Sequence, residues 1–259
     1  MLIKQNLLHL VSHLNSMRRL FTPHKKGFRV LAYHAVGSEV ADDIYGLFSI
    51  EFELFKNHIE ILKNYGVDLI SIEEKNRNPS NLSISLTFDD GYKDNLLVVA
   101  PFLATCSIPF SVFVSTSFTL EKNDGRYLTP VELKKLSKFP GVTIASHSHN
   151  HIPLAKCSDT TLKEELKSSK QILEDIIGKE VTSISYPFGS VNKRVSETAK
   201  EMGYRKGFCS RFDINDIERD PMLLCRTEIS ARDTERIFLQ KLKGDWDWYK
   251  YRHQDPTNT

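Results

Sequence analysis

Short apolar runs alternate along this chain with longer segments in which apolar residues recur every three or four positions. The first pattern predicts buried β-strands and the second predicts amphipathic helices. The expected strands span residues 28–33, 67–72, 83–88, 109–115, 142–146, 181–186, 205–208 and 225–229. Helices are expected to begin near residues 52, 94, 129, 162, 193 and 233, with Gly66 and Gly178 ending the first and the fourth.

This alternation predicts an α/β fold. Strands that alternate with helices form right-handed βαβ units and a parallel sheet. Six or seven such units fit an incomplete or distorted β/α barrel better than an open doubly wound sheet, and both place functional groups at the carboxyl ends of the strands. We expect one domain over residues 28–243, preceded by an N-terminal segment (1–27) and followed by a polar and aromatic tail (244–259).

The N-terminal segment has a helical pattern of its own. One stripe of an amphipathic helix would hold Ile3, Leu7, Leu10, Leu14, Met17 and Phe21. No apolar run approaches the ~18 residues of a membrane-spanning helix, and polar residues interrupt any secretory signal. The stripe fits a helix packed on protein or, alternatively, a peripheral contact of residues 1–26 with an anionic membrane. We therefore expect a cytoplasmic protein, with the inner membrane face as the alternative.

Composition and charge exclude several classes of protein. With 40% hydrophobic and 26% charged residues, the 259-residue chain is neither disordered nor of low complexity. The 35 basic and 33 acidic residues nearly cancel, so we expect no nucleic-acid partner. The four cysteines lie far apart in the sequence, which argues against a disulfide framework and against a thiolate zinc site. Oligomeric state cannot be inferred from these features.

Two adjacent carboxylates follow the expected strand 83–88. Asp89 and Asp90 precede Gly91, which allows the chain to turn sharply. Because consecutive residues leaving a strand point in different directions, one carboxylate can bind a cation while the other accepts a proton. An ordinary surface turn is the alternative for this cluster alone.

Three histidines follow the expected strand 142–146. His147 and His151 are four residues apart, so in a helical turn both imidazoles would face one point, whereas His149 would point elsewhere. Two imidazoles and one carboxylate form a three-ligand set that leaves a position open for water, as a catalytic zinc site requires. A histidine-rich loop without a metal is the alternative.

A third cluster ends the expected strand 181–186. Tyr186, Pro187, Phe188 and Gly189 predict a tight turn in which the backbone N–H of Phe188 could point into the site. A rigid backbone donor is what a developing oxyanion requires. Taken alone, this cluster is only a turn after a strand.

The order of these clusters (TFDDG, HSxxH, YPFG) resembles the NodB-homology polysaccharide deacetylases, carbohydrate esterase family four. The resemblance runs from about Phe28 to Ile229 and is greatest to the branch that acts on biofilm exopolysaccharides. It implies a distorted (β/α)7 barrel and metal-dependent hydrolysis of the N-acetyl group on an amino sugar. The implied cofactor is one divalent ion, preferably Zn²⁺, with Co²⁺, Ni²⁺ or Fe²⁺ as alternatives.

The resemblance also implies roles for individual residues. Asp90, His147 and His151 match the metal ligands. Asp89 matches the general base, and Phe188 matches the residue whose N–H helps to hold the oxyanion. Tyr186, Pro187 and Arg226 are expected to contact the substrate, and Arg226 could instead pair with a carboxylate.

Two features depart from the family pattern. Many members have an arginine two residues before the proline of the third motif, where this chain has Ser185. Many also have a histidine near the C-terminus that protonates the leaving amine, and only His253 in the tail follows Cys225 here. We therefore expect His34, after the first strand, to act as acid or orienting group, with a buried structural histidine as the alternative.

The sequence thus predicts a metal-dependent amino-sugar N-deacetylase that acts on an N-acetylated saccharide. A glycan precursor linked to a lipid or a nucleotide is the expected substrate. Two alternatives remain at this point: a non-catalytic saccharide-binding protein on the same barrel, and a deacylase of a different amide.

Overall fold

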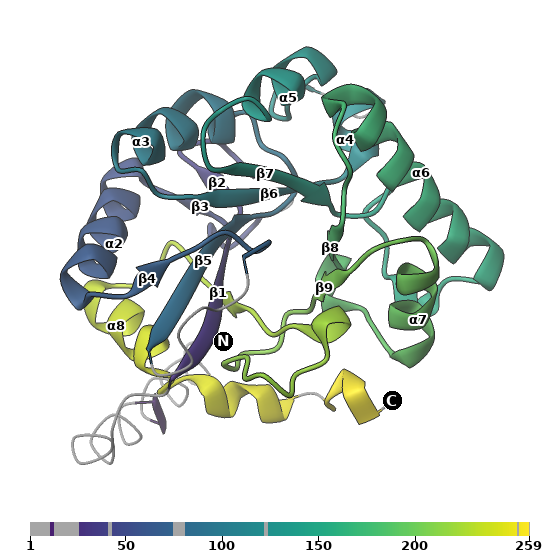
Figure 1. Ribbon diagram of the computed structural model, residues 1–259. Coiled ribbons are helices and arrows are strands. Elements are labelled where there is room, and N and C mark those ends of the chain that lie inside the picture. The colour runs from purple at the N-terminus through teal and green to yellow at the C-terminus, as the bar shows by residue number, and fades with distance from the viewer. Residues whose placement is uncertain are drawn as a thin grey trace.

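The computed structural model describes residues 11–12, 26–40, 43–74, 81–121, 124–252 and 254–258. Seven parallel strands form a curled sheet in the order β10-β1-β5-β6-β7-β8-β9, and β4 adds to the side of β5 (Figure 1). The bounds of these strands are β1 Gly27–Tyr33, β4 Asp68–Leu69, β5 Leu82–Phe88, β6 Phe110–Val114, β7 Val142–Ser146, β8 Ser183–Ser185, β9 Lys206–Phe208 and β10 Thr227–Glu228. A separate two-stranded pair, β2 (Ala35–Val36) and β3 (Ser49–Ile50), follows β1.

Helices surround the strands (Figure 1). Their bounds are α2 Phe52–Tyr65, α3 Ala100–Thr105, α4 Thr116–Leu120, α5 Pro130–Leu136, α6 Asp159–Ile177, α7 Lys193–Glu201 and α8 Glu235–Lys243. Short helical turns are η2 Asn95–Val99, η3 Leu154–Lys156, η4 Pro187–Gly189, η5 Pro221–Leu223, η6 Asp247–Arg252 and η7 Pro256–Asn258. Among the described residues, no helix has the length and apolar character that crossing a membrane would require.

The two edges of the sheet approach each other. Phe208 at the end of β9 forms a parallel bridge with Leu224, which lies just before β10. The N–H of Cys209 also donates to the carbonyl of Leu224 at 2.8 Å. This narrow connection closes a distorted seven-stranded barrel, so the expected fold class is confirmed.

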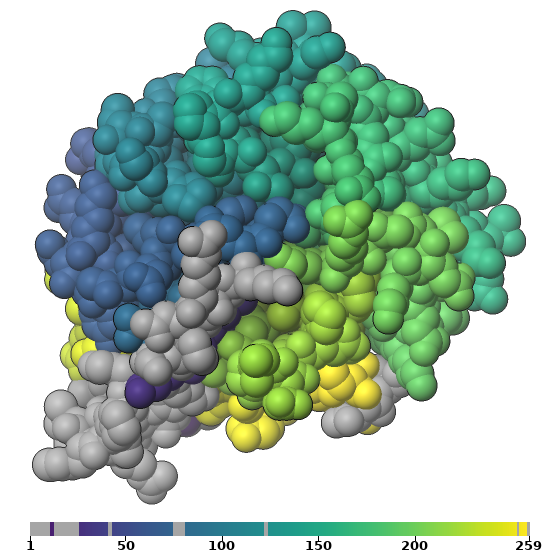
Figure 2. All heavy atoms as spheres, viewed as in Figure 1, coloured from purple at the N-terminus to yellow at the C-terminus, as the bar shows by residue number. Residues whose placement is uncertain are grey.

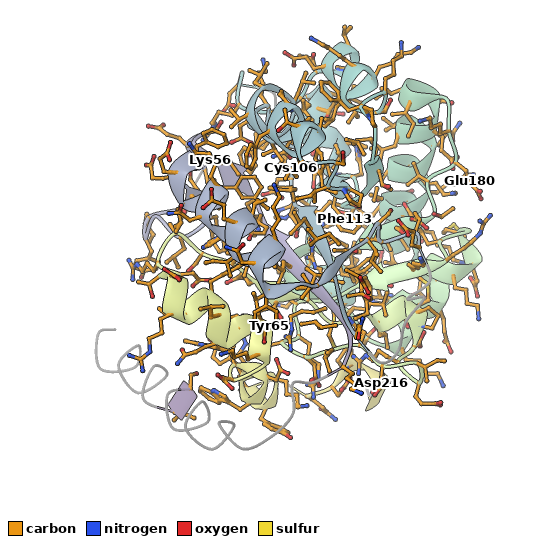
Figure 3. All side chains as sticks on the ribbon, turned by 60° about the vertical axis from the view of Figure 1, so that its left-hand side comes forward. Lys56, Tyr65, Cys106, Phe113, Glu180 and Asp216 are labelled. Carbon is orange, nitrogen blue, oxygen red and sulfur yellow. The ribbon has the colours of Figure 1, made fainter. Side chains whose placement is uncertain are left out.

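Two hydrophobic clusters line the two faces of the sheet. Val30, Phe113, Ala145 and Phe208 come from strands that are not all neighbours, yet they pack together, so this cluster fills the interior of the barrel. Phe113 lies inside the ribbon in Figure 3, in which all side chains are drawn. The larger cluster packs the outer face of the strands against the helices. Because side chains along a strand alternate between the two faces of the sheet, one residue points into the barrel interior and the next points toward the helices.

Local signals in the sequence explain several boundaries. Thr129 and Glu132 form the expected capping box at the start of α5. Gly66 ends α2 with φ 69°, and Gly178 ends α6 with the same angle, a left-handed conformation that favours glycine. The segment expected to be one helix from residue 94 to 105 begins instead as a π-helical turn, η2, before α3.

The C-terminal tail is docked on the barrel. Arg29 on β1 donates to both carboxylate oxygens of Asp247 at 2.9 and 3.1 Å, and both side chains are buried. In Figure 2 the yellow C-terminal residues lie against the light-green part of the chain. Trp248 donates to the hydroxyl of Ser12, which is buried and helical. Gly27 at the end of the expected segment 1–27 belongs to β1, and the apolar stripe of the expected helix (Ile3, Leu7, Leu10, Leu14, Met17 and Phe21) lies outside the described residues.

Candidate metal centre and active site

The carboxyl ends of β1, β5, β7 and β8 meet around one cavity of about 420 Å³. β5 leads to Asp89 and Asp90, β7 leads to His147, and β1 leads to His34. These side chains lie far apart in the sequence and come together because parallel strands all end at the same edge of the barrel. The lining also includes His151, Tyr186, Phe188, Arg226 and Glu228.

Asp90, His147 and His151 form a compact three-ligand group. One ligand atom from each lies within 4.8 Å of the others, the one such group among the described residues. Oδ1 of Asp90 is 3.6 Å from Nε2 of His147 and 3.4 Å from Nε2 of His151. This oxygen is buried and has no hydrogen-bond partner among the described atoms. A buried carboxylate oxygen without a donor is costly unless a cation satisfies it.

Both imidazoles are placed to act as metal ligands. Nδ1 of His147 lies 2.8 Å from the carbonyl of Ser185, which can only accept, so Nδ1 carries a hydrogen and Nε2 faces Oδ1 of Asp90. Burial lowers the pKa of His151 to about 4, assisted by the neighbouring charge of His147. The three residues therefore have the donor chemistry to hold a divalent cation and leave further coordination positions open.

The loop that carries the two histidines is not helical, so the expected helical turn is wrong. Ser148 and His151 have φ values of 60° and 55°, and these left-handed residues bring the second imidazole back beside the first. The buried carboxylate of Glu165 holds the loop, because Oε2 accepts from the N–H groups of His149 (2.9 Å) and Asn150 (2.8 Å). Oε1 of Glu165 accepts from the Asn150 side chain at 2.7 Å.

Glu165 was missed in the sequence analysis. The sequence did contain a signal, because Glu165 interrupts the apolar stripe of α6 next to Leu166. In the structure the Glu165 side chain is almost fully buried. A charged residue on the core face of a helix needs a buried partner. Here the partner is the backbone of the histidine loop. As expected, His149 points elsewhere, with Nδ1 2.7 Å from the hydroxyl of Thr116.

Asp89 lies beside the metal-ligand group and is paired with Arg226. The guanidinium donates from Nη1 to Oδ1 and from Nη2 to Oδ2, both at 2.7 Å, and both side chains are buried. Burial raises the pKa of Asp89, but the charges of Arg226 and His147 outweigh it and hold this pKa well below its usual range. Asp89 is therefore ionised, with Oδ2 3.8 Å from Nε2 of His147.

Arg226 also explains the serine at position 185. Nη2 of the guanidinium donates to the Ser185 hydroxyl at 2.6 Å, and the guanidinium lies 5.4 Å above the ring of Phe113. The small serine leaves room for an arginine that arrives from the β10 side of the barrel. The guanidinium of Arg226 therefore acts as the partner of Asp89. Because both terminal nitrogens already donate to Asp89, the pair of donors that would contact a substrate is occupied.

The turn after β8 forms one wall of the cavity. Phe188 has φ 58°, and its exposed ring lies 4.6 Å from that of His151. Tyr186 borders the cavity but is buried, and its hydroxyl donates to the carbonyl of Met222 at 2.9 Å. Pro187 is buried and is not among the residues that line the cavity, so it shapes the turn.

His34 directly follows β1 and also borders this cavity. Its ring packs against Phe48 with centroids 4.6 Å apart. Nδ1 is buried and has no hydrogen-bond partner among the described atoms, so this nitrogen is uncommitted. The backbone beyond it is anchored by Asp94, whose carboxylate accepts from the N–H groups of Val36 (2.8 Å) and Ser38 (3.2 Å).

Comparison with known proteins places this site in a family. The model for the family described as polysaccharide deacetylase matches residues 76–207, just over half of the chain. The chain belongs to the polysaccharide deacetylase family. The matched region contains Asp89, Asp90, both histidines of the metal-ligand group and the Phe188 turn, so the resemblance drawn from the three motifs is confirmed.

Similar polysaccharide deacetylases come from several bacteria. YxkH of Bacillus subtilis is 25% identical over 184 residues, covering 69% of this chain and 62% of that protein. The poly-β-1,6-N-acetyl-D-glucosamine N-deacetylase of Staphylococcus aureus is 25% identical over 177 residues, covering 62% and 61%. The matched region thus spans about three fifths of these relatives. The deacetylase PplD of Streptococcus pyogenes shares the fold, with a TM-score of 0.74, 24% identity and coverage of 83% and 98%.

Proposed function

We propose that this polysaccharide deacetylase is a metal-dependent hydrolase that removes the N-acetyl group from an amino sugar in a glycan or glycan precursor. The observation that carries the proposal is the placement of an ionised carboxylate, Asp89, directly beside the group formed by Asp90, His147 and His151. Simple saccharide binding would not need a buried base held next to a cation site. Zn²⁺ suits two imidazoles and one carboxylate, and Co²⁺, Ni²⁺ and Fe²⁺ are the alternatives.

Each residue has a chemical task in this reaction. A divalent cation at this site would polarise the amide carbonyl and lower the pKa of a water molecule toward ~7. Asp89 accepts the proton of the attacking water, and Arg226 keeps both carboxylate oxygens aimed and ionised. The backbone N–H of Phe188 is the proposed donor to the oxyanion.

The leaving amine must gain a proton before the C–N bond breaks. We assign this task to His34, because it borders the same cavity and its Nδ1 is uncommitted. Replacing His34 with Gln tests the assignment, since loss of the acid lowers kcat more than it raises KM.

The chemistry of the substrate follows from the family and the site. A relative in Staphylococcus aureus is named for removing acetyl groups from poly-β-1,6-N-acetyl-D-glucosamine. This supports an N-acetylated hexosamine as the reacting unit here. We propose that this unit belongs to a lipid-linked or nucleotide-linked precursor, as expected above.

Acetate release from N-acetylhexosamine oligosaccharides, measured on metal-loaded protein with and without a chelator, tests the proposal. We expect release that a chelator abolishes and that Asp89→Asn lowers by at least ~100-fold. Asp175→Asn is a matched control, because Asp175 is exposed on α6, and it should leave the rate unchanged. Saccharide binding without any acetate release would instead support the non-catalytic alternative, and release only from other N-acyl substrates would support a different deacylase.

A further inference from the structure

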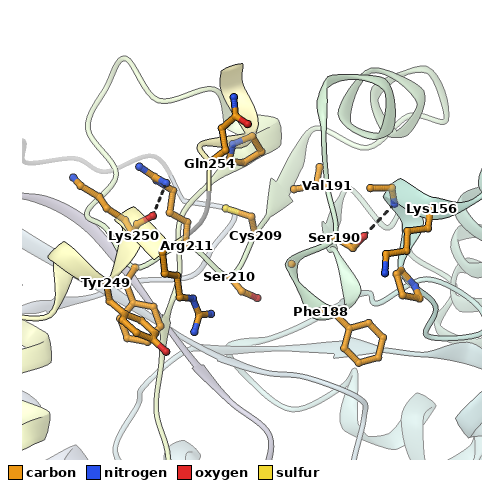
Figure 4. A pocket seen from close by; sticks show the side chains of 16 residues that line it. Lys156, Phe188, Ser190, Val191, Cys209, Ser210, Arg211, Tyr249, Lys250 and Gln254 are labelled. Atoms are coloured by element: carbon orange, nitrogen blue, oxygen red, sulfur yellow. Dashed lines mark hydrogen bonds between the residues drawn. The ribbon is translucent and has the colours of Figure 1, made fainter. Parts of the chain in front are cut away.

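A second cavity of about 650 Å³ adjoins the site already described (Figure 4). It lies between the turn after β8 and the C-terminal segment that contains η6. Phe188, Ser210 and Arg252 border both cavities, so a substrate with its acetamido group at the metal centre can extend into the second one.

The wall between the two cavities is rigidly built. Gly189 has φ 64°, and a Cβ added there would lie 2.8 Å from Cβ of Ser210. Only glycine lets the turn after β8 pack so closely against Ser210. The hydroxyl of Ser190 accepts from the backbone N–H of Ala155 at 3.2 Å, which fixes the far side of the same turn (Figure 4). The wall that the two cavities share is therefore a formed feature of the fold.

The second cavity is basic. Four cationic side chains line it, namely Lys156, Arg211, Lys250 and Arg252, and no Asp or Glu is among the lining residues. Arg211 pairs with Asp255 at 3.0 Å, and Lys250 pairs with Asp213 at 2.6 Å. Two carboxylates thus offset two of the four cations, which leaves an excess of two positive charges.

Lys156 and Arg252 supply this excess. Both are exposed, and within the described part of the chain neither forms an ion pair. The guanidinium of Arg252 lies 4.2 Å above the ring of Tyr249, which also lines the second cavity. Arg252 borders both cavities, whereas Lys156 borders only the second one.

The charge of the deacetylated product indicates which class of substrate a basic cavity can bind. Deacetylation turns a neutral amide into an amine, which is protonated near neutral pH. A polymer that had already lost acetyl groups would therefore bring positive charge into a basic cavity, which is unfavourable. An anionic group joined to the reacting sugar is attracted instead, and phosphate is an anion that Arg and Lys side chains bind through charge-assisted hydrogen bonds.

We infer that the second cavity binds a phosphoryl or diphosphoryl group attached to the N-acetylated sugar. The inference rests on the proposed function, since it names the class of substrate for the same site. A nucleoside-diphosphate sugar and a polyprenyl-diphosphate sugar both carry this group. Cavities of several hundred Å³ are the usual size for ligands of this kind.

The test compares three N-acetylhexosamine substrates: a neutral oligosaccharide, a nucleoside-diphosphate sugar and a polyprenyl-diphosphate sugar in detergent. For each, kcat and KM for acetate release are measured on the metal-loaded wild type, on Lys156→Gln and on Lys156→Gln/Arg252→Gln. We expect the wild type to prefer a phosphorylated substrate. The double variant should reduce this preference by roughly fivefold to tenfold, mainly through KM, because both side chains are exposed and screened. The faster of the two phosphorylated substrates identifies the carrier.

A matched control removes two cations from elsewhere on the surface. Lys193 and Arg205 are 74% and 67% exposed, and neither borders the cavity. Lys193→Gln/Arg205→Gln should leave the preference for phosphorylated substrates unchanged. Since Lys156 does not border the metal centre, an effect of Lys156→Gln alone also separates this cavity from phosphate bound to the metal.

The outcomes separate the inference from the proposed function. Suppose that the neutral oligosaccharide releases acetate and that kcat/KM for both phosphorylated substrates is equal to or lower than its value. This result would overturn the inference and leave the proposed deacetylase function intact. If no substrate releases acetate, the proposed function fails, and direct titration of both diphosphate sugars decides the inference. Binding that the double variant weakens at least about fivefold supports the cavity as a phosphoryl site. No binding, or binding that the variants do not change, refutes it.

Discussion

The pairing of Asp89 with Arg226 can be tested by replacing the arginine. Arg226→Gln removes a guanidinium that makes two 2.7 Å hydrogen bonds to a carboxylate, at a position where both side chains are only 3% and 5% exposed. The carboxylate is then buried without its counter-charge. Breaking a buried pair in this way costs about 3–5 kcal/mol. We expect the free energy of unfolding to fall by this amount.

Urea unfolding of four proteins measures the effect: wild type, Asp89→Asn, Arg226→Gln and the double variant. Each single variant leaves one buried partner unpaired, whereas the double variant leaves two neutral amides. The loss in the double variant should therefore be smaller than the sum of the single losses by about 1–3 kcal/mol. Arg205→Gln is the matched control, because Arg205 pairs with Glu180 at 2.7 Å on the surface, and it should cost at most about 1 kcal/mol.

Activity provides the second readout. Without Arg226 the pKa of Asp89 rises and its carboxylate is no longer aimed by a fork of donors, so kcat should fall at least about tenfold. Arg226→Lys restores the positive charge but cannot form two parallel hydrogen bonds to the Asp89 carboxylate, so it should recover only part of kcat. Additive unfolding energies in the four-protein set, within about 0.5 kcal/mol, would refute the direct coupling.

Three further predictions concern other parts of the molecule. Glu165→Gln places an amide N–H₂ against backbone donors in the histidine loop, so metal affinity measured by titration should fall about 10-fold to 100-fold. Glu164→Gln, on the exposed side of α6, is the control and should leave metal affinity unchanged. Burial lowers the pKa of His58 to about 4 from 6.5, so the unfolded state binds the proton first. The free energy of unfolding should therefore fall by up to about 3 kcal/mol between pH 6.5 and pH 4, and His58→Gln should flatten that dependence in urea titrations. Asp247→Asn leaves Arg29 buried without its partner and should cost about 3–5 kcal/mol, and a thermal melt within error of wild type would contradict this.

Much of the fold could be predicted because local patterns and tertiary structure agree. The apolar runs coincide with β1, β5, β6 and β7, and the left-handed glycines end α2 and α6 as expected. Periodicity alone could not set the lengths of the later strands. The expected strand 225–229 is reduced to β10, because the backbone N–H of Arg226 donates to the carbonyl of Arg211 at 3.0 Å and not to a neighbouring strand.

The candidate site could be predicted in part for a similar reason. Asp90, His147 and His151 each follow a strand, and parallel strands deliver such residues to one edge of the barrel. The local conformation could not be predicted, because spacing of four residues suits a helix, whereas here two left-handed residues make a loop. Glu165 supports that loop from 15 and 16 positions away, a contact that no local pattern encodes.

The serine at position 185 shows why a motif position and a chemical role are different things. Asp89 needs a fixed positive fork, and an arginine can reach a point inside a narrow barrel from more than one strand. Here the fork comes from position 226, 137 residues along the chain from Asp89, and the Ser185 hydroxyl accepts one of its hydrogens. A residue that is absent from its usual motif position is thus replaced in space by one that precedes β10. The departure at residue 185 therefore does not weaken the assignment of Asp89 as the base, because the interaction that the assignment requires is present.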